Sequence, residues 1–137
     1  MATIMVVEDH ADARQLMRDL IEGMGHTVVE ASDGVEGVRY ALSAPLDLII
    51  MDLMMPVASG DSALRFIRGT PGLETIPILV VSAHPDIASI SAQNGATGWV
   101  AKPVRIDELM TKIDKLLATD KPADKPNPSN PSDASKL

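Results

Sequence analysis

The stretch Asp47-Leu48-Ile49-Ile50-Met51-Asp52-Leu53-Met54-Met55-Pro56 constrains how the rest of the chain can fold. Its apolar run, 48–51, is too short for a helix and is typical of a strand buried on both faces of a parallel sheet. A carboxylate is costly in an apolar core, so Asp52 must lie at the carboxyl edge of the sheet or take part in a site. Pro56 cannot continue a central strand.

Length and composition limit the class of protein. The chain has 137 residues, enough for one domain with its own core, and no Cys, which excludes disulfides and thiolate metal sites. The net charge of −7 argues against nucleic acid, whose affinity comes mainly from cationic contacts with phosphate. The apolar runs are too short to span a membrane and the N-terminus lacks a signal-peptide pattern, so we expect a cytoplasmic protein.

Apolar periodicity predicts five strands that alternate with five helices. The predicted strands are 3–7, 26–31, 48–51, 76–81 and 97–101. The predicted helices are 11–24, 33–43, 60–68, 85–94 and 105–118. This alternation predicts an α/β fold, a three-layer doubly wound (βα)5 sandwich with a parallel five-stranded sheet.

The apolar stripes of the helices also predict which side chains face the sheet. Leu16 in the first helix, Val35 and Leu42 in the second, and Ile106 in the fifth are among those expected to point inward.

Polar residues follow the strands at the points where the strands end. Glu8 and Asp9 follow the first strand, Asp52 the third, Ser82 the fourth and Lys102 the fifth. The carboxyl ends of parallel strands lie at one edge of a sheet, so these side chains should converge there.

Three carboxylates beside one ammonium group need a further cation or a raised pKa. At about 5 Å apart, each pair of carboxylates repels by about 3 kcal/mol at an effective dielectric of about 20. Oxygen ligands at an exposed edge suit Mg²⁺, or Mn²⁺ in its place, together with a phosphate group. A carboxylate in such a site can serve as the nucleophile that takes up a phosphoryl group.

The chain resembles the receiver domains of two-component response regulators, chemotaxis regulators of the single-domain type among them. The matching segments are Val6-Val7-Glu8-Asp9, Asp52-Leu53-Met54-Met55-Pro56, Val81-Ser82-Ala83, Gly95-Ala96-Thr97-Gly98-Trp99 and Ala101-Lys102-Pro103. The resemblance covers residues 3–118. It implies a flavodoxin-like sheet of order 2-1-3-4-5 and a receiver domain over 1–119. Residues 120–137 are rich in Pro, Asp, Lys and Ser and have no apolar periodicity, so their composition predicts a disordered tail or a linker.

The resemblance also implies a role for each site residue. Asp52 would be the phosphoacceptor, with Ser82 and Lys102 bound to the phosphoryl group. Asp9 and Asp52 would ligate the metal directly, Met54 through its backbone carbonyl and Glu8 through water. The Lys102–Pro103 peptide bond is expected to be cis.

The same resemblance implies partners and a switch. The phosphodonor would be a histidine kinase or a phosphotransfer protein, and the output would be a protein partner bound by the fourth helix, fifth strand and fifth helix. Ser82 and Trp99 would couple the site to that face, although Trp99 stands where the family usually has Tyr or Phe. A phosphorylation-dependent homodimer is left open, and no direct contact with nucleic acid or membrane is expected.

Three other functions are compatible with parts of this pattern. An aspartate-nucleophile phosphatase or transferase usually has a second Asp two residues after the nucleophile, where this chain has Met54. A receiver-like module that binds partners without phosphorylation would not need the complete set of site residues. A flavodoxin-type cofactor site would place phosphate against Glu8-Asp9-His10, which would repel it. The three histidines, His10, His26 and His84, are predicted to be bystanders.

Overall fold

The computed structural model describes residues 1–55 and 59–119. Pro56 and the predicted tail, 120–137, lie outside the described residues.

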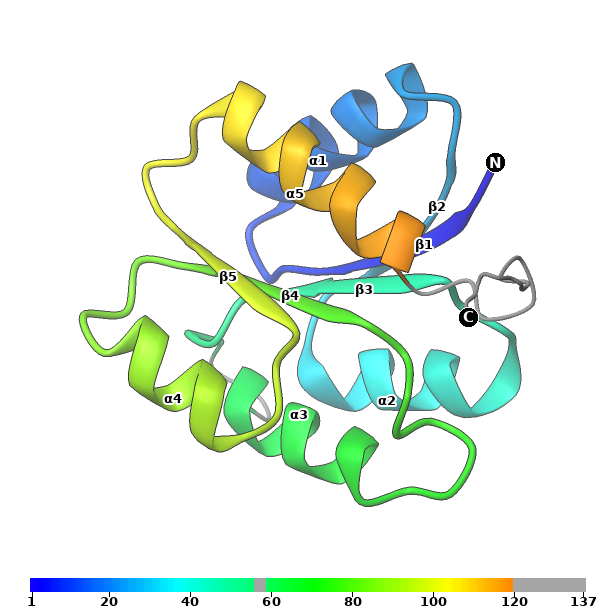
Figure 1. Cartoon of the computed structure of the whole chain (residues 1–137), viewed down its shortest axis with the longest axis vertical. Helices are drawn as coiled ribbons and strands as arrows, with labels where there is room; N and C mark the ends of the chain where they lie inside the picture. The colour runs from blue at the N-terminus through cyan, green and yellow to red at the C-terminus, as the bar shows by residue number, and fades with distance from the viewer. Residues whose placement is uncertain (56–58, 120–137) are drawn as a thin grey trace, which may run out of the picture.

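Within the described residues, five parallel strands alternate with five helices (Figure 1). The strands are β1 (Thr3–Val7), β2 (Thr27–Ala31), β3 (Leu48–Met51), β4 (Ile78–Ser82) and β5 (Gly98–Ala101). The helices are α1 (Ala11–Gly23), α2 (Gly34–Ser43), α3 (Gly60–Arg68), α4 (Ile87–Gln93) and α5 (Ile106–Thr119). The sheet order is β2-β1-β3-β4-β5, which confirms the predicted α/β architecture and strand order.

Successive side chains along each strand point to opposite faces of the sheet and so form two separate cores. One face of the sheet, covered by α2, α3 and α4, carries Met5, Val7, Ile49, Met51, Ile78 and Val80. The opposite face, covered by α1 and α5, carries Ile4, Val6, Leu48, Ile50, Leu79 and Val81. Since all four residues of β3 are buried, this strand is the centre of both cores, as the apolar run predicted.

Four side chains predicted to face the sheet are exposed instead. The exposed fractions are 68% for Leu16, 48% for Val35, 57% for Leu42 and 57% for Ile106. In α2 the reason is the close approach of the helix to the sheet: a Cβ atom at Gly37 would lie 3.1 Å from Val7 Cγ2.

The inner face of α2 is therefore made of its small residues, Gly34, Gly37 and Ala41, and the larger aliphatic side chains turn outward. Leu16 and Ile106 both line a groove between α1 and the start of α5.

Asp33 caps the N-terminus of α2. Its carboxylate accepts a hydrogen bond from the backbone N–H of Glu36, with 2.8 Å between nitrogen and Oδ1. Glu36 Oε1 in turn accepts from the backbone N–H of Ser32 at 2.7 Å. These two bonds satisfy N–H groups that have no partner inside the helix.

Among the described residues, none of the helices has the length and apolar character needed to cross a bilayer.

Gly60, the first residue of α3, packs directly on the backbone that follows β3. A Cβ atom there would overlap the carbonyl oxygen of Asp52 and lie 2.8 Å from Leu53 Cα. The Gly60 N–H also donates to the Leu53 carbonyl at 3.2 Å. Because these neighbours are backbone atoms rather than flexible side chains, the position has no room for a side chain.

We expect Gly60→Ala to lower the free energy of unfolding by about 2 kcal/mol or more, since the helix must shift away from Asp52. The matched control is Gly23→Ala, at the last residue of α1, where no atom lies within 4 Å of an added Cβ. There the free energy should stay level or rise by about 0.5 kcal/mol. Urea denaturation of both variants measures the difference, and equal effects would contradict the packing described for Gly60.

Candidate functional site

The parallel sheet brings the predicted site residues to one edge. Glu8 and Asp9 directly follow β1, Asp52 follows β3, Ser82 ends β4 and Lys102 follows β5. Backbone hydrogen bonds between neighbouring strands continue past the ends of the strands. The Asp52 N–H donates to the Val7 carbonyl at 3.1 Å, and the Lys102 N–H donates to the Ser82 carbonyl at 2.9 Å. The site is therefore an extension of the sheet.

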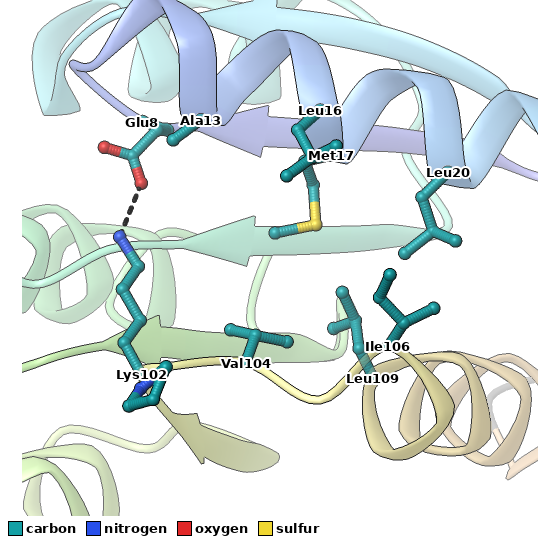
Figure 2. A pocket seen from close by; sticks show the side chains of 10 residues that line it. Glu8, Ala13, Leu16, Met17, Leu20, Lys102, Val104, Ile106 and Leu109 are labelled. Carbon is teal, nitrogen blue, oxygen red and sulfur yellow. Dashed lines mark hydrogen bonds and ion pairs between the residues drawn. The ribbon is translucent and has the colours of Figure 1, made fainter.

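Lys102 joins two of the carboxylates. Its Nζ lies 2.9 Å from Glu8 Oε1 and 3.0 Å from Asp52 Oδ2. Figure 2 shows Lys102 reaching across the end of the sheet to Glu8. Glu8 and Asp52 are each only 6% exposed, so these charges are held largely away from bulk water.

Asp52 is kept ionised by its neighbours. Burial alone would raise its pKa, but the Met54 N–H, the Ser82 hydroxyl and the Lys102 ammonium together hold the pKa below the usual range of Asp. The Met54 N–H donates to Asp52 Oδ1 at 3.0 Å, so both carboxylate oxygens have a donor.

Lys102 is kept protonated in the same way. Burial acts to lower its pKa, but the hydrogen bonds and charges of Glu8 and Asp52 outweigh burial and raise it. The pair is thus ionic at neutral pH, and with Asp9 the site holds three carboxylates around one ammonium group.

Asp9 differs from the other two carboxylates because its Oδ1 accepts no hydrogen bond, although His10 Nδ1 lies 3.4 Å away. Over residues 1–55 and 59–119, the buried side-chain N and O atoms without a hydrogen-bond partner are Asp9 Oδ1 and Ser91 Oγ. The other acids are engaged: Glu8 Oε2 accepts from the His10 N–H at 3.2 Å, and His10 Nδ1 lies 3.2 Å from the same oxygen. A buried carboxylate oxygen that accepts no hydrogen bond, in an excess of negative charge, fits a hard dication such as Mg²⁺.

Ser82 and Trp99 lie on the neighbouring strands β4 and β5. Ser82 is fully buried, and its Oγ accepts a hydrogen bond from the His84 N–H at 3.2 Å. Trp99 in β5 is partly buried and packs against the core beneath α2, α3 and α4, opposite Val80 of β4. The Lys102–Pro103 peptide bond is cis, as predicted.

The structure adds three residues that the sequence analysis did not place at the site. His10 contacts Glu8 instead of being a bystander, and its position directly after the acidic pair was the available signal. Gly60 supports the Asp52 backbone, and Arg14 Nη1 donates to the Glu8 carbonyl at 2.7 Å. For the last two, no local sequence pattern pointed to the contact. His26 is away from the site, where its Nδ1 accepts from the Ala2 N–H at 3.1 Å.

An apolar groove of about 350 Å³ begins beside the Glu8–Lys102 pair and runs between α1 and the start of α5 (Figure 2). Leu16, Met17 and Leu20 line it from α1, and Val104, Ile106 and Leu109 line it from the other side.

Comparison with known proteins gives one consistent result. A family model described as the response regulator receiver domain matches residues 4–114. The chemotaxis protein CheY from Pseudomonas aeruginosa is 32% identical over 116 residues, covering 82% of this chain and 94% of that protein.

The sensor histidine kinase TmoS from Ectopseudomonas mendocina is 36% identical over 121 residues, covering 84% of this chain, but the chain spans only 12% of its length. A crystal structure of the receiver domain of a Pseudomonas aeruginosa sensor histidine kinase, with a magnesium ion coordinated in its active site cleft, superposes with a TM-score of 0.79. It is 28% identical, with 85% of this chain and 98% of that chain covered.

The pKa of Asp52 makes a prediction about stability in acid. Because the folded-state pKa lies below the ordinary value of 3.8, the ionised carboxylate favours the folded state above about pH 4. That contribution is lost as the pH falls through the folded-state pKa. We therefore expect the free energy of unfolding of the wild type, relative to Asp52→Asn, to decrease below about pH 4.

Urea denaturation with a chelator present, from about pH 7 to pH 3, measures the difference. The same comparison in a Lys102→Met background is the control: there the difference should be lost at a higher pH, because one of the groups that lower the pKa of Asp52 is gone. A wild-type difference that is independent of pH would contradict the assignment.

Proposed function

The chain belongs to the response regulator receiver family, and from this premise we propose that Asp52 accepts a phosphoryl group from a histidine kinase or a phosphotransfer protein. The observation that carries the proposal is the buried Asp52 carboxylate, kept ionised at the edge of the sheet with Lys102 Nζ 3.0 Å away. An ionised carboxylate is the form that can act as a nucleophile.

In the proposed transfer, an Asp52 oxygen bonds to phosphorus while the phosphorus–nitrogen bond of the donor phosphohistidine breaks. The electron pair of the broken bond stays on the donor imidazole, which takes up a proton. Lys102 already lies against Asp52 and would neutralise charge on the incoming phosphoryl oxygens. The Ser82 hydroxyl would donate to a further phosphoryl oxygen.

We propose that the site takes Mg²⁺, with Mn²⁺ as an alternative of similar ligand preference. Asp9 and Asp52 would ligate it directly, Met54 through its backbone carbonyl and Glu8 through water. The buried Asp9 Oδ1, which accepts no hydrogen bond, supports this role. When bound, such a dication offsets negative charge between the carboxylates and the phosphoryl group.

The output we propose is a protein partner bound at the face formed by α4, β5 and α5. Ser82 would move toward the phosphoryl group and Trp99 would change its packing in response. The contact of Trp99 with the core beneath α4 supports this route. A phosphorylation-dependent homodimer through the same face stays a prediction, as does the cytoplasmic location.

We do not propose a phosphatase or a transferase acting on another substrate. The position two residues after Asp52, where such enzymes usually carry a second acid, is the exposed Met54. A module that works without phosphorylation would gain nothing from the ionised Asp52–Lys102–Glu8 arrangement, whose buried charges are costly to maintain.

Asp52→Asn should abolish labelling by acetyl phosphate in the presence of Mg²⁺, because the amide cannot act as the nucleophile. The wild type should gain one acid-labile phosphoryl group, seen as a single shift in intact-mass spectrometry. Asp47→Asn, an exposed carboxylate at the opposite end of β3, is the matched control and should label normally. Stoichiometric labelling of Asp52→Asn would remove Asp52 from its proposed role.

We also propose that the protein phosphodonor docks over the groove between α1 and the start of α5. The groove adjoins the Glu8–Lys102 pair, and its margins carry Leu16 and Ile106, which are 68% and 57% exposed. A donor must bring its phosphohistidine to Asp52, so apolar contacts next to the site would orient it.

Leu16→Asp should therefore slow phosphotransfer from a cognate protein donor at least tenfold and leave labelling by acetyl phosphate unchanged. Leu42→Asp is the matched control, since Leu42 is similarly exposed but lies on α2, on the other face of the sheet. Phosphotransfer rates of the two variants are compared with the same donor. An equal loss in both, or none in Leu16→Asp, would place the donor elsewhere.

A further inference from the structure

Arg14 connects the acidic loop after β1 to strand β2. It lies in the first turn of α1, and its side chain is 19% exposed. Its Nη1 donates to the backbone carbonyl of Glu8 at 2.7 Å, and its Nε donates to Glu30 Oε1 at 2.9 Å. One guanidinium group therefore binds two segments of the chain at once.

The Glu8 carbonyl belongs to the peptide group that carries Asp9. That group is planar, so fixing the carbonyl oxygen also fixes the direction from which the Asp9 backbone continues. The side chain of Glu8 is held independently, by Lys102 at one oxygen and by His10 at the other. Asp9 Oδ1 accepts no hydrogen bond, and its nearest charged neighbour is His10 Nδ1 at 3.4 Å, on the same loop. Its position therefore depends on how the backbone of that loop is held.

Glu30 holds the guanidinium group of Arg14 in place. Glu30 lies in β2, paired with Val6 of β1, so the sheet itself positions it. Arg18 binds the other oxygen of Glu30 and also Glu22, and hydrogen bonds from Arg18 and Arg14 hold the pKa of Glu30 below its usual range. Both arginines thus share Glu30, but of the two only Arg14 also donates to Glu8.

We propose that Arg14 is a positioning residue for the metal-binding acidic pair, holding the Glu8–Asp9 peptide so that Asp9 presents its Oδ1 to the dication. This inference rests on the proposed function only in requiring that the site binds Mg²⁺. Lysine cannot replace Arg14, because an ammonium group lacks the rigid fork that bonds Glu8 and Glu30 together. The positive charge alone is therefore not what the site requires.

The experiment compares Arg14→Lys and Arg14→Met with Arg18→Met, the control that breaks the neighbouring bond to Glu30 and leaves the Glu8 carbonyl untouched. Calorimetric titration gives the Kd for Mg²⁺ at a temperature where urea denaturation shows every variant fully folded. Both Arg14 variants should bind Mg²⁺ at least fivefold more weakly, and Arg18→Met should stay within twofold of the wild type. Labelling of the Arg14 variants by acetyl phosphate should approach the wild-type rate once Mg²⁺ is raised to saturation.

Unchanged Mg²⁺ affinity in both Arg14 variants would overturn the inference, and so would an equal loss in Arg18→Met, which would trace the effect to the Glu30 network as a whole. A wild type that binds Mg²⁺ but does not label at Asp52 would contradict the proposed function and leave the Arg14 comparison intact. A wild type that binds no Mg²⁺ would overturn both.

Discussion

The contact of Lys102 with Glu8 and Asp52 is the constraint on which the site depends. It ties the ends of β1, β3 and β5 together, and it places two nearly buried carboxylates against one ammonium group. Removing Lys102 would leave two buried carboxylates without their cation, which is costly even where the intact contacts contribute little to stability. Because Asp9 brings a third carboxylate, the negative charges of the site outnumber the single positive charge of Lys102 by two, and this excess favours a further cation at the sheet edge.

Most of the fold could be predicted because the hydrophobic pattern of the strands is simple. The run 48–51 had to be a central strand, and five alternations of strand and helix leave few topologies. The order of the strands came from the family resemblance and not from the pattern. The orientation of α2 was predicted wrongly at Val35 and Leu42, because periodicity assigns large apolar side chains to the interior. The contact of Gly37 with Val7 reverses that preference, since the helix lies too close to the sheet for larger residues.

The site could be predicted as far as the strand ends determine it. Glu8, Asp52 and Lys102 meet because parallel strands end at one edge, and the residue types already indicated their charges. The supporting residues could not be predicted in this way. Gly60 packs on the backbone of Asp52 and Leu53, and Arg14 donates to the backbone carbonyl of Glu8. Because every residue has a backbone carbonyl, the sequence does not indicate which one a distant side chain will contact. Such contacts follow from how α1 and α3 sit on the sheet, which depends on the packing of the whole domain.

The two faces of the sheet separate the proposed input from the proposed output. Side chains alternate along β5, so Trp99 packs on the side of α2, α3 and α4, whereas Val100 packs on the side of α1 and α5. The groove proposed for the phosphodonor lies on the second side. The sheet between them is tightly filled and leaves little room for movement across it. The two sides meet at the carboxyl edge of the sheet, where Lys102 directly follows β5. Lys102 lies three residues after Trp99 and two residues before Val104, which lines the groove. A change in the charge on Asp52 would therefore reach both faces through the contacts of one lysine.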